Sequence, residues 1–249
     1  MASLVNSHRQ DNEPVYVLHT YPFKETSLVV ELFAHGFGRV ATTAKGARRP
    51  RSAMRGMLQS FQPLIATWSG RLELKTLHSL DWAGGLLLLK GEALMCGFYL
   101  NELLLSLLPR EDPHEALFEY YGLTLKILAS SQDFATTLRR FELKLLQELG
   151  YAIPLEVDEN NAVIKSTEAY VYVAEHGASL LNSQQPSHFT SHRNGVQLHG
   201  KTLIDMANDD YSHAQTQQQS KQLMRYLLAH YLGDKPLHTR QFLIDLQGL

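Results

Sequence analysis

A dense group of cations lies in the first third of the chain. The run Lys45-Gly46-Ala47-Arg48-Arg49-Pro50-Arg51 continues to Arg55 without an acidic residue, so five cations fall within eleven residues. Like charges at this density repel one another unless water or bound phosphate groups screen them. The segment from Lys45 to Arg55, called the basic loop below, therefore predicts contact with nucleic acid, and the alternative is an ordinary solvated loop.

Further cations and aromatic residues extend this prediction. Lys24, Arg39 and Arg71 widen the patch if the surrounding strands close into a barrel. Phe37 and Trp68 are candidates for stacking on bases, although an aromatic residue at a strand end more often belongs to the core. The predicted DNA-binding cations are Lys24, Arg39, Lys45, Arg48, Arg49, Arg51, Arg55 and Arg71.

Charge is distributed unevenly along the chain, although the net charge is only −2. Residues 1–80 hold ten basic and five acidic residues, which leaves thirteen basic and twenty acidic residues in the remainder. A basic first third joined to an acidic remainder indicates that the first third contacts a polyanion.

A second motif supports a rival function. The segment from Gly195 to Thr202 satisfies the G-x-x-x-x-G-K-[ST] pattern of a nucleotide-binding P-loop. Such a loop normally follows a buried apolar strand, and here polar residues precede Gly195. The alternative is that Lys201 and Thr202 open a helix. A P-loop nucleotide-binding protein remains a rival hypothesis, which predicts nucleotide binding that Lys201→Ala abolishes.

The sequence shows no signature of metal or nucleophile chemistry. His188, His192 and His199 lie in a polar stretch without cysteine neighbours, and we interpret them as exposed loop histidines. Cys96 is the only cysteine, which excludes an internal disulfide and a thiolate cluster for zinc. The G-x-S-x-G motif of serine hydrolases is absent. We therefore expect no catalytic residues, no metal and no cofactor, and a protein that is not an enzyme.

The sequence has no segment that resembles a membrane span or a secretion signal. A span needs about 20 apolar residues, and the most apolar stretch, Leu86 to Leu108, is interrupted by Lys90, Glu92, Asn101 and Glu102. The first fourteen residues lack the apolar core of a signal peptide. We expect no membrane association and a cytoplasmic, nucleoid-associated location.

The segments that position the basic loop resemble short strands. Apolar and polar residues alternate in several of them, and turn-forming residues separate them. A five-stranded Greek-key barrel with a connection, often helical, between its third and fourth strands is the OB-fold, and the basic loop falls in that connection. The predicted strands are Val15 to Thr20, Leu28 to Phe33, Arg39 to Thr43, Phe61 to Trp68 and Leu72 to Ser79.

After Asp81 the apolar spacing becomes helical, with apolar residues three or four apart. The fold class is therefore α+β: an OB-fold barrel domain, residues 1–80, precedes a mostly helical domain, residues 81–249. The predicted helices are Leu86 to Leu108, His114 to Ser130, Phe134 to Leu149, Thr202 to Ala207, Gln215 to Tyr231 and Thr239 to Leu246. A hairpin of Tyr170 to Ala174 and Ala178 to Leu181 precedes a polar loop, Asn182 to Asn194.

Three groups of motifs together resemble the RecO family of recombination mediators. In the barrel region they are Phe23-Lys24-Glu25-Thr26-Ser27-Leu28, Gly38-Arg39-Val40 and Ala44-Lys45-Gly46-Ala47-Arg48. In the helical region they are Tyr99-Leu100-Asn101-Glu102-Leu103, Leu138-Arg139-Arg140-Phe141-Glu142-Leu143 and Leu149-Gly150-Tyr151. Near the end they are Tyr231-Leu232-Gly233-Asp234-Lys235-Pro236-Leu237 and Thr239-Arg240.

This resemblance implies an OB-fold joined to a helical C-terminal domain. It implies binding of single- and double-stranded DNA and annealing of complementary strands. It also implies that the protein, together with RecR, helps RecA to displace single-stranded-DNA-binding protein. A pure protein-interaction adaptor is the other alternative, and it predicts partner binding without DNA affinity.

The resemblance also makes two predictions about the helical domain. In the family, the acidic C-terminal tail of single-stranded-DNA-binding protein docks there, and the matching cations are Arg139 and Arg140, with Lys144 beside them. An internal salt bridge of the two arginines with Glu142 or Glu102 is the alternative. Many relatives carry a four-cysteine zinc site after the Gly-Tyr motif, and the region from about 151 to 200 should lack it because residues 151–182 contain no cysteine.

Overall fold

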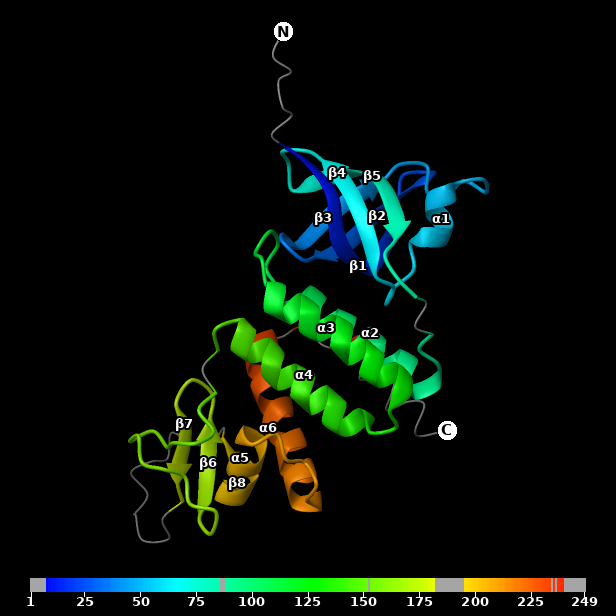
Figure 1. Cartoon of the computed structure of the whole chain (residues 1–249). Coiled ribbons are helices and arrows are strands. Elements are labelled where there is room, and N and C mark those ends of the chain that lie inside the picture. The colour runs from blue at the N-terminus through cyan, green and yellow to red at the C-terminus, as the bar shows by residue number, and fades with distance from the viewer. Residues whose placement is uncertain are drawn as a thin grey trace. The chain divides into compact units, whose positions relative to one another are not determined.

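The chain forms two compact units in the computed structural model shown in Figure 1. One unit comprises Met1–Gln132 and Leu237–Leu249, and the other comprises Asp133–Pro236. The structure describes residues 8–85, 88–151, 153–181, 195–233, 235 and 237–239. The predicted polar loop, residues 182–194, and all but the first residue of the predicted last helix lie outside these ranges.

The first unit contains a closed barrel of five strands in the order β1-β2-β3-β5-β4, closed by pairing of β4 with β1. The β3 and β5 strands pair in parallel, and the short helix α1 (Ala53–Met57) connects β3 to β4. This is the OB-fold topology, so the predicted fold class is confirmed. The strands are β1 (Arg9–Phe23), β2 (Ser27–Ala34), β3 (Gly38–Ala44), β4 (Leu64–Ser69) and β5 (Leu74–Trp82).

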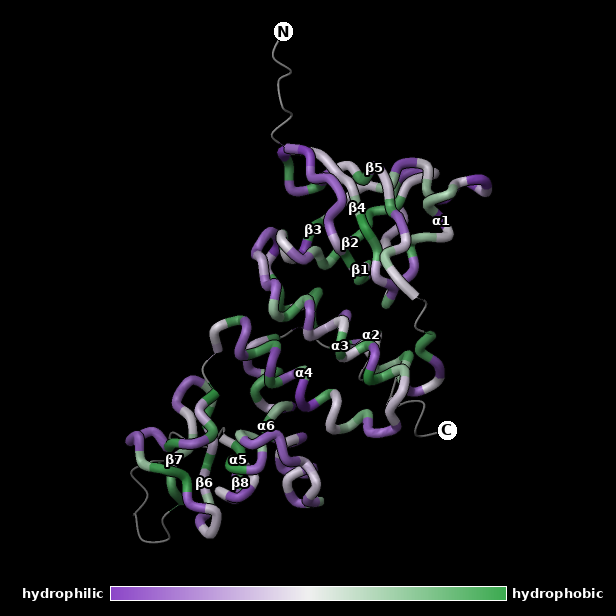
Figure 2. Tube along the Cα trace, viewed as in Figure 1, coloured by the Kyte–Doolittle hydropathy of each residue, from purple (hydrophilic) through white to green (hydrophobic). Residues whose placement is uncertain are grey.

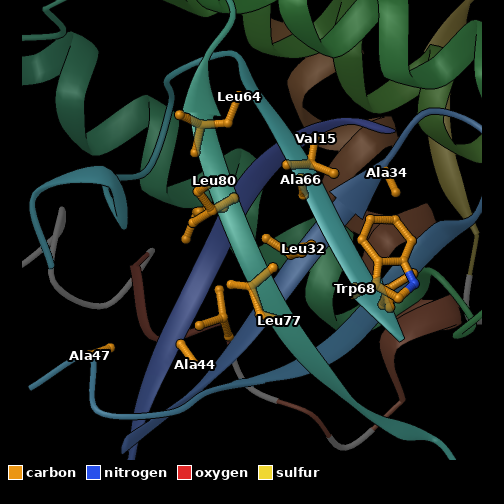
Figure 3. Packing of buried hydrophobic residues seen from close by; sticks show 13 residues of the cluster. Val15, Leu32, Ala34, Ala44, Ala47, Leu64, Ala66, Trp68, Leu77 and Leu80 are labelled. Carbon is orange, nitrogen blue, oxygen red and sulfur yellow. The ribbon is translucent and has the colours of Figure 1, made fainter. Parts of the chain in front are cut away.

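Most strands contribute alternate residues to the barrel core, whereas β5 contributes Leu77 and Leu80, three residues apart. Val15 and Val17 of β1 are buried there, together with Leu32 of β2. Figure 3 shows Leu32 and Leu77 inside the barrel, with the indole of Trp68 among the buried side chains. Figure 2 shows hydrophobic residues along these strands and hydrophilic residues at the turns. The burial of apolar area therefore follows the period of two on which the strand predictions rested.

A β-bulge reverses the side to which β1 residues point. The register of β1 on β2 shifts between Val17 and His19, so Leu18 is the extra residue. Odd-numbered residues face the core before the bulge and face outward after it. The Leu18 carbonyl accepts a 2.8 Å hydrogen bond from the side-chain amide of Asn101, in helix α2 (Gly91–Leu107). The helix that follows the barrel thus binds the bulge.

Helices α2 and α3 (Glu115–Ser130) belong to the same compact unit as the barrel. Tyr16 of β1 packs against Tyr121 with ring centroids 5.0 Å apart, and Phe33 of β2 packs against Phe118 at 5.3 Å. These aromatic contacts explain why the compact unit extends past residue 80. The domain boundary between residues 80 and 81 stays a prediction.

In its described residues, the second unit contains three helices and a small antiparallel sheet in the order β7-β6-β8. The predicted hairpin is confirmed as β6 and β7, and the three helices match predicted ones. The strand β8 was not predicted, because only four residues separate Gly195 from the next glycine. The elements are α4 (Phe134–Glu148), β6 (Ala169–Val173), β7 (Gly177–Leu180), β8 (Val196–His199), α5 (Gly200–Ala207) and α6 (Ala214–Leu232).

Candidate nucleic-acid interface

The basic loop leaves the end of β3, and its last residues, up to Arg55, belong to α1. Ala47 in its middle is fully buried in the core cluster of the barrel. Backbone hydrogen bonds of 3.0 Å from Arg49 to Gly46 and from Ser52 to Arg49 close successive turns. The cationic side chains therefore extend from a backbone that a buried residue and turn hydrogen bonds hold in place.

The basic loop is bound to the turn between β1 and β2. The backbone amide of Arg48 donates a 2.9 Å hydrogen bond to the carbonyl of Thr26. The guanidinium of Arg48 donates to the carbonyls of Glu25 at 3.2 Å and Lys24 at 3.4 Å. These contacts place Lys24, which is exposed, beside the basic loop.

All five cations of the basic loop are exposed, and none forms an ion pair with a carboxylate in the described part of the chain. Other cations of the same unit are paired: Lys75 lies 2.6 Å from Glu111, and Arg110 binds the carboxylates of Glu31 and Glu73. The basic loop therefore keeps its positive potential, which a phosphate backbone can neutralise.

Two predicted DNA-binding residues lie elsewhere. Arg39 is near the start of β3, whereas the basic loop leaves its end, and its guanidinium donates to the carbonyl of Leu105. Burial lowers the pKa of Arg39. Arg71 is exposed in the β4–β5 turn, which lies beside the start of β1, whereas Lys24 follows the end of β1. The structure thus brings together Lys24 and the five cations of the basic loop.

The two aromatic residues considered for base stacking belong to the interior. Trp68 is 2% exposed and is part of the barrel core. Phe37 packs against that core, with its ring centroid 5.5 Å from the indole of Trp68 in an edge-on geometry. The core alternative is therefore the one that the structure shows, because an enclosed indole presents no face to a base.

The three cations considered for partner docking, Arg139, Arg140 and Lys144, are all ion-paired within the second unit. The salt bridge from Arg139 to Glu142, the alternative that the sequence offered, is present, and Glu142 is 0% exposed. The partners of Arg140 and Lys144 are more accessible. The nitrogen–oxygen distances are 2.5 Å for Arg139–Glu142, 2.6 Å for Arg140–Asp209 and 2.6 Å for Lys144–Glu148.

The segment that fits the P-loop pattern does not have the geometry of a phosphate-binding loop. The residues between its two glycines form β8, which pairs antiparallel with β6, and α5 starts directly at Gly200. A Cβ atom on Gly200 would lie 2.0 Å from the carbonyl oxygen of Lys165, so this glycine permits close backbone packing. The ammonium of Lys201 pairs with Asp205 at 2.9 Å. The P-loop alternative is therefore wrong for the described structure.

Metal-binding clusters, the cysteine thiol and the histidines are the remaining groups that could support other chemistry. Within the described ranges, no cluster of three or more His, Cys, Asp or Glu residues could hold a metal ion. Burial raises the pKa of the Cys96 thiol to about 11, so it is not a reactive thiolate at neutral pH. His199 is exposed at the end of β8, and His188 and His192 lie outside the described residues.

The helices that the structure describes include none that combines the length and the apolar character needed to cross a membrane.

The sequence matches two family models that together span most of the chain. Residues 10–86 match Recombination protein O N terminal, and residues 88–241 match Recombination protein O C terminal. Several curated proteins named DNA repair protein RecO are similar over nearly their full length. The protein of Nitrosospira multiformis is 51% identical, with 98% of this chain and 99% of that protein covered. For Aromatoleum aromaticum the identity is 51%, with 97% and 98% covered, and for Burkholderia pseudomallei it is 48%, with 100% and 88% covered.

Proposed function

The chain belongs to the RecO family, and from this premise we propose that it acts in DNA repair and homologous recombination by binding single- and double-stranded DNA and annealing complementary strands. The observation that supports this most directly is the group of exposed cations formed by Lys24 and the basic loop. Annealing requires no bond chemistry, because a cationic surface lowers the repulsion between two phosphate chains and leaves their bases free to pair. The proposed protein is therefore a binding protein and not an enzyme.

The purified chain is expected to bind fluorescent single-stranded DNA with an affinity that falls as salt rises. If each of the five basic-loop cations neutralises one phosphate, the logarithm of the affinity falls against the logarithm of the salt concentration with a slope of about −3.5. Fluorescence anisotropy at several salt concentrations, with and without ATP, measures this slope. A chain that ignores oligonucleotides at low salt contradicts the proposal and favours a pure adaptor, whereas ATP-dependent binding contradicts it in favour of a nucleotide-binding protein.

We further propose that the protein works with RecR, with the acidic C-terminal tail of single-stranded-DNA-binding protein and, indirectly, with RecA. An acidic tail that docks on α4 must compete with carboxylates already in place. Arg140 is suited to such exchange, because its partner Asp209 is 64% exposed and ion pairs at the surface contribute only about 0–1 kcal/mol. Lys144 pairs with Glu148 at partly exposed positions, so this pair is more accessible than that of Arg139. Arg139 is less suited, since its partner Glu142 is buried and would be left without its cation.

The double variant Arg140→Ala, Lys144→Ala is expected to bind a fluorescent peptide with the tail sequence about 10-fold more weakly than the wild type, because two charge-assisted contacts are lost. Fluorescence polarisation measures this affinity. The matched control is Lys165→Ala, Lys221→Ala, which removes two exposed cations of the same unit that are not part of α4. If the two double variants bind the peptide with equal affinity, Arg140 and Lys144 are not part of the proposed docking site.

A further inference from the structure

The outer face of the barrel presents three rows of side chains across β1, β2 and β3. Residues paired on neighbouring strands point to the same side of a sheet. Val30 and Leu32 of β2 point into the core, so the residues between and beside them point outward. The rows are Tyr16, Phe33 and Arg39; His19, Glu31 and Ala41; and Tyr21, Val29 and Thr43, with Leu74 and Thr76 of β5 continuing the second and third rows.

The first row is covered by the helical part of the same unit. Tyr16 is 9% exposed and Phe33 is 0% exposed, and both rings pack against Phe118 of α3. Arg39 is bound to the carbonyl of Leu105 in α2. A nucleic-acid strand cannot reach these side chains while α2 and α3 are in place.

The middle of the second row is closed by the connection between α2 and α3. Glu31 is 3% exposed and Ala41 is 2% exposed. Arg110, in that connection, binds the carboxylates of Glu31 and Glu73, and the backbone amide of Glu111 donates a 2.9 Å hydrogen bond to the carbonyl of Arg39. This part of the barrel is covered by the connection, and its cation Arg110 is already bound to two carboxylates rather than free for a phosphate.

The third row is the one that adjoins the cations. Tyr21 is 45% exposed and Val29 is partly exposed, whereas Thr43, the next residue of the row, is 7% exposed. The accessible part of the row next to the cations is therefore its β1–β2 end. Tyr21 precedes Lys24 by three residues, and Thr43 precedes Lys45 by two residues, separations of roughly 7–10 Å along a strand. An exposed aromatic ring therefore lies within one or two nucleotide lengths of unpaired cations.

Resting on the proposed function and deepening it, we infer that Tyr21 is a base-stacking residue for single-stranded DNA. The DNA strand follows the third row, and the phosphates of the strand contact Lys24 and the basic loop. The Tyr21 ring packs edge-on against the His19 ring, with centroids 4.4 Å apart, and the residue remains 45% exposed. An exposed phenol ring can stack on a base of any sequence, and adjacent cations hold the backbone. Tyr21 points outward only because of the bulge at Leu18; without the bulge, the alternation that buries Val15 and Val17 would turn it into the core.

Tyr21→Ala is expected to weaken binding of oligo(dT) about 10-fold, because one base loses its stacking partner. The salt slope should stay unchanged, since no phosphate contact is lost, and the affinity for duplex DNA should change less than 2-fold, since duplex bases stack on one another. Tyr21→Phe should bind like the wild type. Fluorescence anisotropy measures the affinities, and quenching of a 2-aminopurine base in the strand reports the stacking itself.

Phe98→Ala is the matched control, because Phe98 is 41% exposed but lies on α2, where its ring packs against Phe61. If Tyr21→Ala binds oligo(dT) within 2-fold of the wild type, or loses single-stranded and duplex binding equally, the assignment of Tyr21 is wrong while DNA binding by the basic loop stands. If the wild type binds no oligonucleotide at low salt, the proposed function itself fails.

Discussion

Replacing Arg48, Arg49 and Arg51 with alanine is expected to flatten the salt dependence of single-stranded DNA binding, and the contribution of the five basic-loop cations to the slope should change from about −3.5 to about −1.4. Each of these side chains is exposed, and none is neutralised by a carboxylate in the described part of the chain. Between 50 and 200 mM salt this contribution should therefore lower the wild-type affinity about 130-fold, and that of the triple variant only about 7-fold. Fluorescence anisotropy with labelled oligo(dT) at four or more salt concentrations gives both slopes.

A charge-matched control separates this effect from a general loss of positive charge. Lys165, Lys221 and Arg225 are exposed residues of the second unit, and their triple alanine variant removes the same net charge. That variant should keep the wild-type slope. If both triple variants flatten the slope equally, the DNA contact is not localised at the basic loop. Thermal unfolding of each variant checks that the barrel stays folded when the hydrogen bonds of Arg48 are lost.

Asn101→Ala is expected to lower the free energy of unfolding by about 3 kcal/mol. Asn101 is 2% exposed; its amide donates to the carbonyl of Leu18 at 2.8 Å, and its carbonyl oxygen accepts from the hydroxyl of Tyr121 at 2.5 Å. Burial raises the pKa of Tyr121, so its hydroxyl stays protonated and keeps donating. Alanine can replace neither contact, and the bulge carbonyl is left without this donor in a dry environment.

Urea unfolding followed by circular dichroism measures this loss, and Tyr121→Phe provides the comparison. That variant removes only the hydroxyl and should lower the free energy of unfolding by about 1 kcal/mol. Most of the Asn101 effect therefore comes from the lost hydrogen bond to the bulge carbonyl of Leu18. Because the two residues are in contact, the double variant should be less destabilised than the sum of the single variants. A cost below 1 kcal/mol for Asn101→Ala would show that water or another group replaces the amide.

The sequence alone determined the fold class and the position of the basic loop. Alternation of apolar residues in several segments, together with the turn residues between them, predicted the five strands, because burial on one face of a strand follows a period of two that neighbouring residues carry themselves. Helical spacing predicted α2 to α6 in the same way. The density of cations between Lys45 and Arg55 predicted an exposed segment, since so much like charge cannot be buried without partners.

Only the tertiary structure decided which side chains are available at the interface. Arg39 is bound to α2, Trp68 fills the core, and Arg140 is paired with Asp209, 69 residues away in sequence. Tyr21 points outward because of one extra residue in β1, which no apolar pattern revealed. The physical reason is that periodicity records only whether a position is buried, whereas the partner of a charged or aromatic group comes from distant segments that meet on folding.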